Sequence, residues 1–437
     1  MHSIFGSVRL ASLRNIITKK KKGAIALADQ IIASATNFLT GMIIARACTK
    51  EEFGTYVLCF NIVMFILDIQ TALLSSSYMV HSQGMKIKER AEYTGNTMIQ
   101  QVILSLLAIF TLTAVLCLFP DKLRKMGLGP TLHTLALVIV FIMFRDFIRR
   151  ICFADMRMHR AIMVDITVAL FQLSGLMVLL MCGSISAQSS FMIIGAACAT
   201  ASVLWLYTDR SLYKLDMKGF SKSLVKNWSF GSWMFGSTLL WAASMTLYPW
   251  LLTWFHGPAA IGIWGACWGV TALANPLIIG IQNFLGPDIV KSYISGGISG
   301  LKHNIREKTI MYVTAVLPLS ILLILSGPYL VPFIYGDKYR GTGTIVTILA
   351  LTITINAAAY PVSRALLALK EAKMYFWTSF VPLLVTLSCG IVLVKQFGPL
   401  GVAWGLLIGT IITGALMGIC FIGVAPKHEV PTKESPS

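Results

Sequence analysis

Long apolar runs separated by short polar segments dominate the hydrophobic pattern of the chain. A helix needs about 20 predominantly apolar residues to cross a bilayer, and these runs have that length. They lack the strict alternation of apolar and polar residues that is typical of membrane β-barrels. The pattern therefore predicts an all-α polytopic membrane protein with about twelve transmembrane helices, near residues 24–45, 55–80, 97–119, 131–147, 161–183, 189–208, 229–255, 259–285, 309–333, 344–363, 375–394 and 399–424.

The predicted spans divide into two halves with the same orientation. When the chain is shifted by 208 positions, Phe53-Gly54-Thr55-Tyr56 overlays Ile261-Gly262-Ile263-Trp264, and each motif follows a short turn. Six helices per half give a parallel pseudo-repeat, related by an axis along the membrane normal. We therefore expect two six-helix lobes in the following order: a basic amphipathic N-terminus (1–22), an N-lobe (23–208), a basic linker (209–228), a C-lobe (229–424) and a disordered tail (425–437).

Composition and charge support a membrane protein and its orientation. Of the 437 residues, 56% are hydrophobic and 12% are charged, about half the charged fraction of soluble proteins. The net charge of +18 would indicate nucleic-acid binding in a soluble protein. Here, 28 of the 36 lysines and arginines lie in segments on one side of the membrane, as the positive-inside rule requires. We expect both termini in the cytoplasm and no nucleic-acid partner.

Catalytic and metal-binding motifs are missing from the sequence. It has no HExxH, GxSxG, Walker or dinucleotide-binding motif, and the segments between predicted spans are short. The nine cysteines are scattered through apolar stretches without CxxC or Cys/His spacing, which argues against a zinc site or a disulfide framework. We therefore expect no enzyme activity, cofactor or metal, and interpret the chain as a channel, a carrier or a membrane scaffold.

Polar residues within the predicted spans are the candidate functional groups. An ionisable group in hydrocarbon costs about 2.5–3.5 kcal/mol, so it usually faces protein or water. Asp68 lies deep in the second span, on one helical stripe with Asn61 and Ser75. We interpret it as the residue that carries a coupling proton or cation. The other candidates for the substrate or ion pathway are Asn37, Asn275, Gln282, Asn283, Asn356, Asp29, Arg46 and Arg364.

Each candidate also has a structural interpretation. Amides commonly form hydrogen bonds between membrane helices, worth about 0.6 kcal/mol each. Asp29 and Asp165 lie near the inside ends of their spans, where they can cap a helix or reach the interface, and Arg364 can be interfacial in the same way. The sequence leaves open whether these polar stripes face one cavity.

Four short motifs resemble bacterial polysaccharide flippases. The opening motif runs from Lys22-Gly23 through Ala28-Asp29-Gln30 to Glu51-Glu52-Phe53-Gly54-Thr55-Tyr56, and Asp68 with Ser75 resembles the family's second helix. The segments 332–339 and 397–403 resemble the turns after its ninth helix and before its last helix. These flippases are the O-antigen and exopolysaccharide transporters of the multidrug/oligosaccharidyl-lipid/polysaccharide (MOP) superfamily.

The resemblance implies ion-coupled translocation of an undecaprenyl-diphosphate-linked oligosaccharide across the bacterial inner membrane by alternating access. It implies membrane lipids as partners, with a polysaccharide polymerase and glycosyltransferases as further candidates. The family is expected to have a cationic cavity, whereas Arg46, Arg145 and Arg364 lie at predicted helix ends. Two alternatives remain open: a multidrug/cation antiporter of the same superfamily, and a non-transporting scaffold for polysaccharide assembly that recruits enzymes through its basic loops.

Overall fold

The computed structural model describes residues 25, 28–215, 219–369, 371, 374, 377, 378 and 380–428. The predicted amphipathic N-terminus and most of the predicted tail lie outside these residues. Within them the chain is helical and without strands, and eight helices are long and apolar enough to cross a membrane. The prediction of an all-α multi-pass membrane protein is therefore confirmed.

The chain forms two compact units, each with residues from two parts of the sequence. Unit 1 comprises residues up to Cys48 together with Ile62–Gly236, and unit 2 comprises Thr49–Asn61 and the residues from Ser237 onward. Unlike the uninterrupted lobes expected from the sequence, these units share two helices. The second helix begins in unit 2 and ends in unit 1, whereas α9 begins in unit 1 and ends in unit 2.

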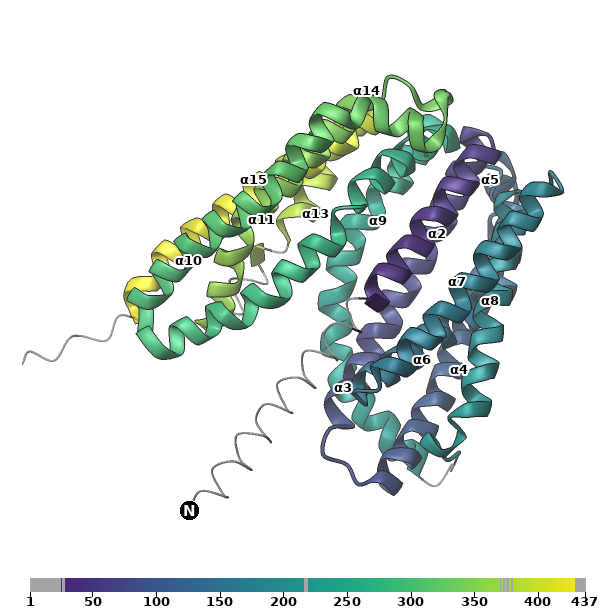
Figure 1. Ribbon diagram of the computed structural model, residues 1–437, viewed down its shortest axis with the longest axis horizontal. Helices are drawn as coiled ribbons and strands as arrows, with labels where there is room; N and C mark the ends of the chain where they lie inside the picture. Colours follow the sequence, from purple (N-terminus) through teal and green to yellow (C-terminus); the bar gives the residue numbers. More distant parts are fainter. Residues whose placement is uncertain are drawn as a thin grey trace, which may run out of the picture. The chain divides into compact units, whose positions relative to one another are not determined.

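In unit 1, α6 is the central helix and packs against α4, α7 and α8 (Figure 1). Its residues Leu135, Ile139 and Met143 are fully buried and recur at helical spacing, which places one apolar face against its neighbours. The first helix spans 28–47. It is followed by α2 (Lys50–Gln70), a π-helical turn η1 (Thr71–Ser75), α3 (Ser76–His81), α4 (Ile87–Leu118), α5 (Pro120–Lys125), α6 (Gly129–Ala154), α7 (Met158–Met181), α8 (Ala187–Thr208) and η2 (Arg210–Leu212).

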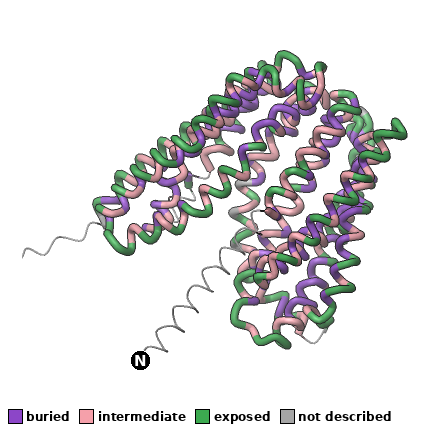
Figure 2. Tube along the Cα trace, in the orientation of Figure 1, coloured by how far each residue is buried: buried purple, intermediate pink, exposed green. Residues whose placement is uncertain are grey.

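In unit 2, α11 packs between α10 and α15. Leu285, Tyr312 and Ala357 belong to their shared apolar core, and Figure 2 shows buried positions recurring along each helix. Large side chains on the outer face, such as Leu325 (70% exposed) and Phe333 (75%), are suited to contact lipid. The elements are α9 (Phe220–Ala272), α10 (Asn275–Tyr335), η4 (Asp337–Tyr339), α11 (Gly343–Ala368), α13 (Val381–Val385), η5 (Thr386–Gly390), α14 (Ile391–Phe397), α15 (Pro399–Val424) and η6 (Ala425–His428).

Two glycines turn the chain where the sequence predicts loops. Gly257 (φ 76°) interrupts α9 and Gly297 (φ 58°) interrupts α10. Glycine adopts such positive φ angles without the steric penalty of a Cβ atom. Each long helix is therefore two helices in sequence, which accounts for separate seventh, eighth and ninth spans.

Several helices extend further than hydropathy predicts. The seventh span is predicted from 229, but α9 begins at Phe220 within the predicted linker. The third is predicted from 97, but α4 begins at Ile87. Hydropathy identifies only the part of a helix that lies in hydrocarbon, so it misses polar turns that continue beyond it.

Candidate functional site

A buried network of ion pairs joins three helices of unit 1. Arg149 donates from Nη2 to Asp29 Oδ2 (2.6 Å) and from Nε to Asp165 Oδ2 (2.8 Å), and Arg145 pairs with the other oxygen of Asp165. The Asp29 and Asp165 side chains are 1% and 0% exposed. Arg145 and Arg149 are one helical turn apart on α6, so they present both guanidinium groups to the first helix and α7.

The network neutralises charges that would otherwise destabilise the bundle. Two carboxylates face two guanidinium groups, and removing either partner of a buried pair leaves an uncompensated charge. The Asp29 Oδ1 and Arg145 Nε atoms are buried without a hydrogen-bond partner among the described residues. Asp29 Oδ1 can therefore accept a further hydrogen bond or a proton, and Arg145 Nε can donate a further hydrogen bond.

This geometry corrects two expectations from the sequence. The fourth helix does not end at 147 but continues to Ala154, because its charged residues are paired within the bundle. The alternative in which Asp29 and Asp165 cap helix ends or reach the interface is wrong, since both are buried in ion pairs. The sequence predicts Asp29 as a site residue, but it does not predict Arg145 or Arg149 as site residues.

A second polar chain begins on the same helix, α6. Arg150 pairs with Asp146 (2.7 Å), and Gln70 donates to the same carboxylate oxygen (3.3 Å). Gln101 then donates to Gln70 Oε1 (3.1 Å), which links α6, α2 and α4 through fully buried amides. Polar chains of this kind hold membrane helices together where the surroundings are apolar.

Asp68 lies beside this chain without joining it. Its carboxylate is half-buried and interacts electrostatically with Arg150 and Asp146. Among the described residues it forms no ion pair or hydrogen bond, and the π-helical turn η1 follows three residues later. Asp68 is therefore better placed to exchange a proton or cation than the paired Asp29 and Asp165.

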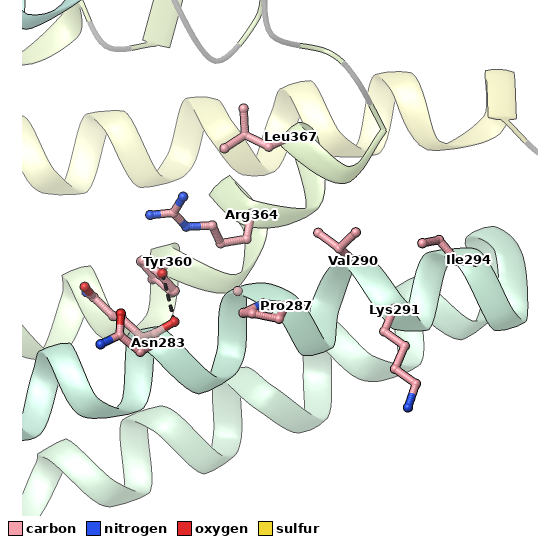
Figure 3. A pocket seen from close by; sticks show the side chains of 10 residues that line it. Asn283, Pro287, Val290, Lys291, Ile294, Tyr360, Arg364 and Leu367 are labelled. Atoms are coloured by element: carbon pink, nitrogen blue, oxygen red, sulfur yellow. Dashed lines mark hydrogen bonds between the residues drawn. The ribbon is translucent and has the colours of Figure 1, made fainter. Parts of the chain in front are cut away.

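Unit 2 contains a pocket of about 670 Å³ between the first part of α10 and the end of α11 (Figure 3). This volume lies within the range of small-molecule sites. Three residues selected from the sequence meet here, namely Gln282, Asn283 and Arg364. The remaining lining residues are Gly286, Pro287, Val290, Lys291, Ile294, Tyr360 and Leu367.

Arg364 is held over an aromatic ring at the side of this pocket. Its guanidinium carbon lies 4.7 Å from the centre of the Tyr360 ring, and the Tyr360 hydroxyl donates to the Gln282 main-chain oxygen (3.2 Å). The Tyr312 ring meets Tyr360 edge to face. Figure 3 shows Arg364 extending along the pocket, whereas the exposed Lys291, which also lines it, points away from Arg364. Arg364 is therefore the lining cation that a neighbouring ring holds in one direction.

The other selected residues lie apart from this pocket. Asn61 donates to Val57 O within its own helix (2.8 Å), so its amide is partly satisfied locally. The remaining four, which are exposed and do not line the pocket, are Asn37, Arg46, Asn275 and Asn356.

Sequence reasoning missed Tyr360 and Lys291 as pocket residues. Tyr360 lies four residues before Arg364, one turn away on α11. Residues at this spacing are neighbours on a helix surface, so the position of Tyr360 could have been predicted from that of Arg364. The proximity of Gln282 could not be inferred in this way, because it comes from a different helix.

Comparison with known proteins identifies the family. Residues 20–291 match the model of a family described as polysaccharide biosynthesis protein. The chain belongs to this family. The family predicted from the four short motifs is thereby confirmed. No curated protein sequence matches the chain.

Solved structures of low sequence identity share the fold. An inward-facing multidrug resistance MATE family transporter of the MOP superfamily superposes with a TM-score of 0.76 at 16% identity, covering 91% of this chain and 96% of that one. The lipid II flippase MurJ, in an inward closed conformation, gives 0.68 at 14% identity over 91% and 86%. A MOP superfamily transporter from Pyrococcus furiosus gives 0.62 at 15% identity over 93% and 96%. This chain therefore has the fold of MOP transporters.

Proposed function

We propose that the protein transfers an undecaprenyl-diphosphate-linked oligosaccharide, an O-antigen or exopolysaccharide repeat unit, across the bacterial inner membrane. The observation that carries this proposal is the family match over residues 20–291 in a chain with the MOP fold. One of the proteins that share this fold is named as a lipid II flippase. We infer no catalysis and no cofactor, and we place both termini in the cytoplasm on the basis of the lysine and arginine distribution.

The physical task suits this fold. The polar head group needs a hydrated path while its polyprenyl tail stays in lipid. Two lobes that open alternately to each side would supply such a path, as in transporters built from parallel repeats. Polysaccharide polymerases and glycosyltransferases are the partners that would consume and supply this substrate.

The proposal predicts protein-dependent leaflet transfer in proteoliposomes. A fluorescent polyprenyl-diphosphate oligosaccharide in the inner leaflet should become accessible to an outside quencher, and a proton or sodium gradient should accelerate its transfer. Empty liposomes provide the background rate. No transfer, combined with gradient-dependent export of small cationic dyes, would instead support a multidrug antiporter, the function named for one of the similar structures. If the protein shows neither leaflet transfer nor dye export, the scaffold alternative remains.

For ion coupling, we propose Asp68 as the exchanging group. It is half-buried and unpaired among the described residues, whereas Asp29, Asp146 and Asp165 are held in ion pairs. A carboxylate in the membrane without a fixed partner can bind a proton or cation at little structural cost.

We expect Asp68→Asn to abolish gradient acceleration, reducing the transfer rate to that measured without a gradient. Asp68→Glu should retain part of the acceleration, because it keeps the carboxylate. Asp121→Asn, at an exposed aspartate on α5, is the matched control and should behave as the unmodified protein. Undiminished acceleration in Asp68→Asn would rule out this coupling role.

A further inference from the structure

Unlike the paired arginines of α6, Arg364 has no acidic partner in the part of the chain that the structure describes. Arg145, Arg149 and Arg150 each pair with an aspartate. Among the described residues, Arg364 forms no ion pair or hydrogen bond, and its Nε atom is buried without an acceptor. Leaving a buried donor unpaired is costly, so such a group is expected where a ligand supplies the acceptor.

The surroundings of Arg364 fix its direction before any ligand arrives. The guanidinium stacks on Tyr360, whose hydroxyl is tied to the main chain of α10. Arginine keeps its charge at all physiological pH values and presents a planar fork of N–H donors that matches a carboxylate. An oriented guanidinium also loses less side-chain entropy when it binds.

The rest of the lining suits a hydroxylated ring. The Gln282 and Asn283 amides can each donate to and accept from sugar hydroxyls. Asn283 is exposed and makes no hydrogen bond within the described part of the chain. Val290, Ile294 and Leu367 give the pocket an apolar side against which the C–H face of a sugar can pack.

The two cations that line the pocket do not converge, and this arrangement favours a ligand group with a single negative charge. Lys291 lines the pocket but points away from Arg364 (Figure 3). A diphosphate carries at least two negative charges, and such groups are usually bound by several converging cations or by a helix N-terminus. One guanidinium beside two amides matches one carboxylate on a sugar ring.

We propose that this pocket binds an acidic sugar of the transported head group, with its carboxylate on Arg364 and its hydroxyls on Gln282 and Asn283. The proposal rests on the proposed function and adds that the substrate contains a uronic acid or a similar acidic sugar. In the predicted topology, Lys291 and Arg364 belong to the inside ends of their helices. The pocket would therefore receive the head group on the cytoplasmic side, before transfer.

Binding to the full-length protein in lipid nanodiscs tests this assignment by calorimetry. The probes are a trisaccharide ending in glucuronate, its carboxyl-reduced counterpart and inorganic pyrophosphate. We expect the acidic trisaccharide to bind about tenfold or more tightly than the reduced one, as a charge-assisted hydrogen-bond pair implies. Arg364→Gln should remove this preference, whereas Arg306→Gln, at an exposed arginine of α10, should leave it unchanged.

Equal binding of the two trisaccharides, binding of neither, or an unchanged preference in Arg364→Gln would overturn the proposal. Tighter binding of pyrophosphate that depends on Arg364 would also overturn it and would assign the site to the lipid-linked diphosphate. If Arg364→Gln fails to fold, Asn283→Ala decides instead, because it should weaken both trisaccharides equally. The binding readout needs no transport, so a retained acidic preference without leaflet transfer would contradict the proposed function alone.

Discussion

Replacing Arg149 with methionine should destabilise unit 1 by about 3–5 kcal/mol, the usual cost of leaving buried charges without their partner. Arg149 contacts both Asp29 and Asp165, and the two carboxylates are almost completely inaccessible to solvent. Without the guanidinium group, Asp165 would keep only Arg145, and Asp29 would lose its ion pair. Thermal unfolding of the purified protein in detergent would measure the loss.

The neighbouring residue on α6 provides a control for this prediction. Arg150 pairs with a single carboxylate, and after its removal that carboxylate, Asp146, still accepts a hydrogen bond from Gln70. Arg150→Met should therefore cost less than Arg149→Met, about 1–3 kcal/mol. Adding Asp29→Asn and Asp165→Asn to Arg149→Met should recover part of the loss, because the buried charges are then removed. Equal destabilisation by Arg149→Met and Arg150→Met would contradict a special role for the buried network.

This network shows what could not be predicted from the sequence. Hydropathy measures the cost of each charge in isolation, so the fourth span is predicted to end at 147, just after Arg145 and Asp146. The helix continues because these charges are paired. Arg145 and Arg149 have partners on the first helix and α7, whereas Asp146 pairs with Arg150 on α6 itself. Arg149 and its partner Asp29 are 120 positions apart. Such a pairing depends on which helix faces are adjacent, and a single sequence does not show which faces these are.

The all-helical, multi-pass character of the fold could be predicted, because bilayer thickness fixes the length of each apolar run. The turns at Gly257 and Gly297 also fall in predicted loops. The sequence predicts which spans contain Gln282, Asn283 and Arg364, but it does not predict that these side chains line one pocket. Asn275 and Asn356 are amides in the same spans, yet neither lines that pocket. Hydropathy locates a residue along a helix, whereas a shared pocket also depends on how each helix is rotated about its axis.

The internal repeat has a structural counterpart inside unit 2. Gly54 and Gly262 are equivalent positions of the repeat, and each lies against the helix that carries the other. A Cβ atom on Gly54 would overlap the main-chain oxygen of Pro258, and one on Gly262 would overlap that of Lys50. Lys50 and Pro258 are themselves equivalent under the same shift of 208 positions. The contact between the two helices is therefore nearly symmetric, which the predicted parallel repeat explains.

We expect Gly54→Ala and Gly262→Ala each to destabilise the protein by about 1–3 kcal/mol, because overpacking displaces neighbouring backbone. The close approach involves main-chain atoms, which cannot rotate away as a side chain can, and membrane helices use small residues for such contacts. Gly418→Ala on α15 is the control: its added methyl group would have no atom within 4 Å. It should be neutral or stabilise the helix by up to about 1 kcal/mol. Thermal unfolding in detergent distinguishes the cases. If both glycines tolerate alanine as Gly418 does, the helices are not in tight contact, and the equivalence of the two motifs is a feature of sequence alone.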